Sequence, residues 1–102
     1  MKIRMMDGVR QHRKYPETFS IPDRTAKVAV QVGDYVKLSF INTSRDPDQV
    51  GGERMWVMVK KIDGRKYSGV LHNEPISFQK RALKYGDKIE FESRHILDII
   101  RR

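Results

Sequence analysis

The fold class is decided by residues 53–73, which read ERMWVMVKKIDGRKYSGVLHN. Two runs rich in β-branched and aromatic residues flank Asp63 and Gly64. Asp-Gly between two alternating apolar runs is the strongest short-range signal for a β-hairpin. The stretch also holds the only tryptophan, Trp56. It therefore predicts a central antiparallel hairpin, although it names no reaction.

Both strands of this hairpin carry apolar residues on both faces. Side chains alternate across a strand, so the first strand divides into Met55, Val57 and Val59 against Trp56, Met58 and Lys60. The return strand divides into Tyr67, Gly69 and Leu71 against Ser68, Val70 and His72. Two apolar faces favour cover on both sides, as in a small barrel or a tightly curled sheet. The mid-strand glycine predicts a bulge or a sharp bend.

Upstream of the hairpin, Gly33 and Asp34 predict a turn that leads into a half-buried strand over residues 35–41. Before this turn, Asp23 can cap a turn of helix over residues 24–27, and a short extended segment follows it.

Downstream of the hairpin, Ser77 can cap a short helix over residues 78–85. A second Gly-Asp pair, in a segment that looks like the first, precedes an alternating strand over residues 88–92. Residues 93–95 then turn the chain into residues 96–100, which fit a short strand or a helical turn. Together these elements predict an α+β, mostly β fold: a small curled antiparallel sheet or an SH3-like barrel with one or two short helices.

The composition bounds the class of protein. At 102 residues the chain is one domain, which we divide into a basic N-terminal arm at residues 1–17 and a single compact β-rich domain at residues 18–102. The absence of cysteine excludes disulfides and thiolate chemistry. No apolar run approaches the roughly 18 residues of a membrane span, and the N-terminus lacks the apolar core of a signal peptide. We expect a cytoplasmic protein with no membrane association.

The net charge of +8 is the one unusual feature of the composition, because such a charge attracts polyanions or an acidic protein. The candidate contacts to nucleic acid or to an acidic partner are Lys2, Arg4, Arg10, Arg13, Lys14, Lys60, Lys61, Arg65 and Lys66. Candidate recognition residues are Trp56, Tyr67, His72, Asn73 and His95. If Trp56 faces outward it can stack on a base or anchor a peptide. If it faces inward it belongs to the core, the commoner place for a lone tryptophan.

No pattern of residues indicates catalysis or metal binding. The three histidines lie in separate segments with no ligand spacing, and no phosphate-binding loop or nucleophile elbow occurs. Residues 42–52 contain little that a core could use and are expected to form a mobile or binding loop. Asp46 and Asp48 within it fit a solvated turn better than a cation site. We therefore predict a non-enzyme with no cofactor and no metal.

Four segments together resemble a known family. They are residues 33–40 (GDYVKLSF), 54–57 (RMWV), 69–75 (GVLHNEP) and 85–91 (YGDKIEF), followed by His95 and Ile96. This set is similar to the YegJ-like group of small bacterial proteins, a domain of unknown function also found on mobile elements. The resemblance spans roughly residues 19–99 and leaves out the basic arm.

The resemblance implies a compact α+β or barrel-like domain with no established reaction. The group's relatives include toxin-immunity domains, which implies protein binding. One departure is His72, where the group leads us to expect an acidic residue before Asn73. We therefore expect a non-enzymatic protein-binding module of inhibitor or immunity type, from a bacterium, phage or mobile element. The alternative is a nucleic-acid-binding module that uses the basic arm and the hairpin turn.

Overall fold

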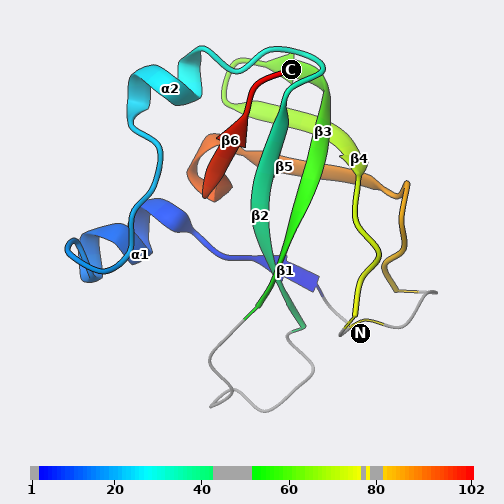
Figure 1. Ribbon diagram of the computed structural model, residues 1–102, viewed down its shortest axis with the longest axis horizontal. Coiled ribbons are helices and arrows are strands. Elements are labelled where there is room, and N and C mark those ends of the chain that lie inside the picture. Colours follow the sequence, from blue (N-terminus) through cyan, green and yellow to red (C-terminus); the bar gives the residue numbers. More distant parts are fainter. Residues whose placement is uncertain (1–2, 43–51, 77, 79–81) are drawn as a thin grey trace.

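The structure is a computed structural model that describes residues 3–42, 52–76, 78 and 82–102 (Figure 1). Its elements are β1 (Ile3–Met5), α1 (Gly8–Lys14), α2 (Arg24–Val28), β2 (Tyr35–Asn42), β3 (Glu53–Asp63), β4 (Lys66–Leu71), β5 (Lys88–Glu92), the 3-10 helix η1 (Ser93–His95) and β6 (Asp98–Ile100).

The described strands form one antiparallel sheet in the order β1-β2-β3-β4-β5. The edge of β2 that does not face β3 is shared by β6, which pairs with Tyr35–Lys37, and β1, which pairs with Phe40–Asn42. Because η1 carries the chain from β5 back to this edge, the sheet is nearly closed into a small barrel. The predicted fold class, mostly β with two short helices, is confirmed.

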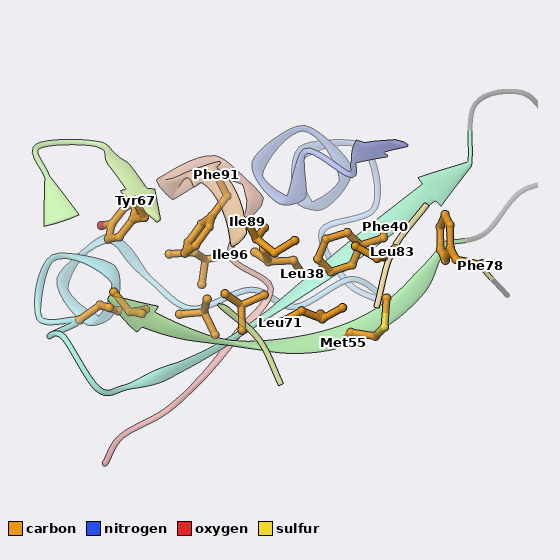
Figure 2. Close-up of a cluster of buried hydrophobic side chains, with 14 residues drawn as sticks. Leu38, Phe40, Met55, Tyr67, Leu71, Phe78, Leu83, Ile89, Phe91 and Ile96 are labelled. Carbon is orange, nitrogen blue, oxygen red and sulfur yellow. The ribbon is translucent and has the colours of Figure 1, made fainter. Parts of the chain in front are cut away.

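The core lies inside this curl and is built from one of the two alternating faces of each hairpin strand, together with the inner face of β2. Figure 2 shows Leu38, Met55 and Leu71 among side chains that are almost fully inaccessible to solvent. On the opposite face of β3 and β4, Trp56 and Val70 are only half-buried. The expected cover on both sides is therefore only partial, and the hairpin has one buried face and one partly open face.

The predicted hairpin turn is confirmed in a specific form. Gly64 has φ +62°, and among the described residues every positive φ belongs to a glycine, so the next residue, Arg65, has a negative φ. Asp63 pairs with Lys66, which places Gly64 and Arg65 at the two central positions. Glycine first with a positive φ, then a residue with a negative φ, is the sign pattern of a type II′ turn.

The predicted bulge is also present, on the strand opposite Gly69. Val59 pairs with Gly69, but the next pair is Lys61 with Ser68, so Lys60 has no cross-strand partner. A Cβ atom at Gly69 would lie 2.2 Å from the Met58 carbonyl oxygen. Only glycine permits this close approach of the two backbones, and the extra residue bends β3 and increases its twist.

The two Gly-Asp segments make the same turn. Gly33 and Gly86 have φ +97° and +88°. Their N–H groups donate to hairpin carbonyls, Gly33 to Val59 and Gly86 to Leu71, each at 2.8 Å. In both turns the aspartate side chain accepts a backbone N–H from three residues earlier, at 2.9 Å. Each turn thus attaches the chain before β2 or β5 to one strand of the hairpin.

The helix predictions are partly right. Asp23 caps α2 by accepting the Ala26 N–H at 2.8 Å, but the described residues after α2 form a turn and not the predicted extended segment. Phe78 and the described residues 82–85 are not helical, and Phe78 lies in the core. Ser77, residues 79–81 and residues 43–51, with Asp46 and Asp48, lie outside the described residues. The open alternative for residues 96–100 resolves to the strand β6.

The segment predicted as a basic arm forms β1 and α1. Asp7 caps α1 by accepting the Arg10 N–H at 3.0 Å, and it forms an ion pair with Arg94 at 3.2 Å. Gly8 is buried, and a Cβ atom there would lie 2.6 Å from the Leu97 side chain. These contacts attach α1 to the segment around η1.

We expect Gly69→Ala to destabilise the fold by about 1–3 kcal/mol, because the atom nearest to the added methyl group is the Met58 backbone oxygen, which cannot move aside as a flexible side chain can. Urea unfolding followed by tryptophan fluorescence measures this free energy. The neighbouring Ser68→Ala, on the opposite and half-buried face, should change it by less than about 0.5 kcal/mol. Equal stability of Gly69→Ala and the wild type would contradict the close approach.

Candidate functional site

The partly open face of the sheet gathers a group of aromatic and apolar side chains. The strand register places Met58 opposite both Tyr35 and Val70, and Trp56 opposite Lys37, so these side chains share one face. We call the group the outer-face cluster; it consists of Tyr35, Trp56, Met58, Val70, His72 and Tyr85. It contains two of the predicted recognition residues, Trp56 of β3 and His72, which directly follows β4.

His72 is the centre of this cluster. Its ring centroid lies 5.2 Å from that of Tyr35 and 5.4 Å from that of Tyr85. The Tyr85 hydroxyl and His72 Nδ1 are hydrogen-bonded at 3.1 Å. Tyr85 remains 49% exposed. The Gly-Asp turns explain this meeting, because Tyr35 directly follows one turn and Tyr85 directly precedes the glycine of the other.

Trp56 is half-buried on the same face, so its side chain lies on the outside of the sheet and not in the core. The Lys37 ammonium lies 4.9 Å from the centre of its ring, a distance suited to a cation–π contact. Its backbone N–H donates to the Asn73 side-chain oxygen, and its carbonyl accepts the His72 N–H at 2.9 Å. Asn73 therefore holds the end of the hairpin against β3, and Trp56 is fixed in position.

The other two recognition candidates lie inside the molecule. Tyr67 is buried and stacks on Phe91, with ring centroids 5.2 Å apart and an interplanar angle of 9°. His95 is buried, and its Nδ1 accepts the Glu92 N–H at 3.0 Å. Alternation puts Tyr67 on the inner face, and η1 turns His95 inward; the recognition role of both stays a prediction.

The predicted cationic contacts form two groups on the surface. Arg4, Arg10, Arg13 and Lys14 are exposed on β1 and α1, and Lys60, Lys61, Arg65 and Lys66 are exposed at the end of the hairpin. Lys2 lies outside the described residues. Helix α1 and the end of the hairpin meet at an open pocket of about 720 Å³, which is lined by His12 of α1 and Arg65 of the hairpin turn.

The third wall of this pocket is α2, and sequence reasoning missed its contribution. Arg24 is exposed, but Lys27 is only 6% exposed. Burial lowers the pKa of Lys27, and the Asp7 carboxylate offsets this only in part. In the part of the chain that the structure describes, the Lys27 ammonium has no hydrogen bond or ion pair. A lysine on a short helix is usually solvated, so the residue type gives no reason to expect that Lys27 is buried.

No metal centre is found in the described residues, where no three His, Asp or Glu side chains are grouped to hold an ion. Within the same residues, no helix is long and apolar enough to cross a membrane.

We expect His95 to make the fold less stable in mild acid. Burial, with the nearby Arg94 charge, lowers the pKa of His95 below its usual 6.5. Between the lowered value and 6.5 the unfolded chain binds more protons, so stability falls as pH drops through this range. His95→Asn, which keeps an acceptor for the Glu92 N–H, should lose less stability between pH 7.5 and pH 5.5 in urea unfolding.

The matched control is His72→Asn at an exposed histidine, which should retain the part of the acid loss that comes from His95. Parallel pH dependence of the wild type and His95→Asn would contradict this role for the buried ring.

Comparison with known proteins gives one family. The model of DUF2314, described as an uncharacterized protein conserved in bacteria, matches residues 5–101. No curated protein and no solved structure matches the chain. The matched region includes α1, so it reaches further toward the N-terminus than the resemblance to the YegJ-like group. Because the match covers nearly the whole chain, the protein belongs to DUF2314, a family of uncharacterised proteins conserved in bacteria.

Proposed function

We propose that this protein is a non-enzymatic binding module, of inhibitor or immunity type, that holds an acidic protein partner on its outer-face cluster. The observation that carries the proposal is the fixed group of rings around His72 on the partly open face of the sheet. Tryptophan, tyrosine and methionine are enriched where proteins bind one another, and a few such residues supply most of the affinity.

The arrangement of the rings favours a protein over a nucleic-acid strand. Stacking of successive bases needs open ring faces. The Trp56 ring already carries the Lys37 ammonium, and the His72 ring is tilted by 56° and 46° against its two tyrosine neighbours. These side chains are held by contacts within the protein, so binding a partner costs little additional side-chain entropy.

Charge supports an acidic partner. Lys37 and Arg54 follow the outer face of β2 and β3, and Lys60 at the bulge is exposed. With a net charge of +8 on the chain, an acidic protein is drawn to this surface by long-range attraction.

Trp56→Ala should weaken partner binding by about 2 kcal/mol or more, roughly 30-fold, because tryptophan is among the residues that supply most of the affinity at protein interfaces. The assay is capture of the partner from nuclease-treated lysate of the native host, followed by titration with the purified partner. His72→Ala, at an exposed position, should also weaken binding without threatening the core. Tyr15→Ala, an aromatic that is 45% exposed and lies just beyond α1, is the matched control and should bind like the wild type.

Binding that survives both cluster substitutions would rule out this surface as the docking site. Loss of all captured material on nuclease treatment would favour the second candidate.

The second candidate is nucleic-acid binding, which the two groups of exposed cations on α1 and at the hairpin end support. It predicts that affinity for a dT20 oligonucleotide falls steeply between 50 and 200 mM salt, measured by fluorescence anisotropy. If Arg13 and Lys14 each contact a phosphate, their joint replacement by alanine lowers the slope by about 0.7 per lost contact. Absence of binding at 50 mM salt would exclude this candidate.

A further inference from the structure

The pocket between α1, α2 and the hairpin turn is separate from the outer-face cluster. None of its lining residues belongs to the cluster, and both helices lie to the same side of the sheet (Figure 1). Its volume of about 720 Å³ is within the usual range of about 300–1,000 Å³ for small-molecule sites. The size therefore suits a small molecule.

Most of the wall is apolar. Val9 of α1, Ile21 before α2 and Ile62 near the end of β3 line it, together with Val28 and Val30. Val28 is 76% exposed and Ile62 is 36% exposed, unusual fractions for large apolar side chains that face one hollow. Two such residues on opposite walls leave apolar surface in contact with water, which an apolar ligand body would cover.

The charge within this wall is positive and incompletely balanced. The Lys27 side chain is only 6% exposed, and its ammonium forms no ion pair with a described residue. Both carboxylates of the lining are engaged: Asp23 accepts the Ala26 N–H at 2.8 Å, and Glu92 forms an ion pair with Arg94 at 3.2 Å. Arg65 adds a further cation from the hairpin turn.

The Lys27 stem is buried, but its ammonium is not among the fully buried unpaired atoms of the described residues, so the charged end reaches solvent without an ion pair. Burial of the side chain lowers the pKa of Lys27, so the charged form of the amine is disfavoured where it has no anionic partner. An oxyanion in the pocket would supply the missing partner through a charge-assisted hydrogen bond.

We propose that this pocket binds a small anionic amphiphile, whose oxyanion pairs with Lys27 and whose apolar body packs against Val9, Val28 and Ile62. The oxyanion is a carboxylate or a phosphate monoester; both present the same charged oxygens to the ammonium. This site is independent of the proposed docking of a protein partner, so either can fail without the other.

Isothermal titration of the full chain with octanoate and with octyl phosphate, both below their micelle concentrations, tests the site. At least one should bind at least ten-fold more tightly than neutral 1-octanol, and the tighter of the two identifies the head group. Lys27→Met, which keeps the length of the side chain and removes its charge, should weaken the anion at least ten-fold and leave octanol unchanged. Lys88→Met, an exposed lysine outside the pocket, should bind like the wild type.

The thermal midpoint shows whether the variant is folded. Lys27→Met should melt near the wild-type temperature, because it keeps the buried length of the side chain and removes a charge that forms no ion pair. The proposal is overturned if neither anion binds at millimolar concentration, or if Lys27→Met binds them as the wild type does. It is also overturned if acetate or inorganic phosphate binds as tightly as its octyl counterpart, because the apolar wall then contributes nothing.

Discussion

The close approach of Gly69 to the Met58 carbonyl is the constraint on which the rest of the structure depends. It brings β4 against β3 at the bulge, where β3 bends and the sheet curls. The two Gly-Asp turns attach to the hairpin close to this point. One is bonded to Val59, which pairs with Gly69, and the other is bonded to Leu71. The inner face thereby closes around the core (Figure 2), and the end of the hairpin meets α1 and α2 at the pocket. The partly open outer face and the pocket are both consequences of one bend.

The features that the sequence predicted well are those encoded within a few residues. Alternation separated the two faces of the hairpin strands without deciding which is buried. The Asp-Gly and Gly-Asp pairs identified the turns, because glycine is the residue that readily adopts a positive φ. Within the helix predicted over residues 78–85, the described residues Phe78 and 82–85 are not helical, for a tertiary reason. Phe78 and Leu83 pack into the core, and the Gly86 N–H is bonded to Leu71, so contacts with the sheet override a helical spacing. The strand β1 is three residues long, and its pairing with the edge of β2 has no local signature.

The binding surfaces show the same division. Trp56 and His72 stood out in the sequence because they are polar or aromatic residues in strand positions. Tyr35 and Tyr85 did not, since only the sheet register and the two Gly-Asp turns bring them to His72 from segments about fifty residues apart. Lys27 was missed because a lysine on a short helix is usually solvated, and the residues after it were expected to be extended. The burial pattern, with Lys27 and Val30 inside and Val28 outside, follows the helical period and not the period of two.

Asp7 connects the pocket to the fold. One of its oxygens accepts the Arg10 N–H and the other pairs with Arg94, so a single carboxylate links the start of α1 to η1. Burial alone would raise the pKa of Asp7, but these partners lower it below its usual value and keep the group charged. The same negative charge favours the protonated form of Lys27, yet too weakly to restore its usual pKa. An anion bound at Lys27 would therefore pair with the ammonium, and the nearby Asp7 carboxylate is already paired with Arg94. Such a ligand would bridge α2 to the α1 side of the pocket, and by mass action it would stabilise the folded chain.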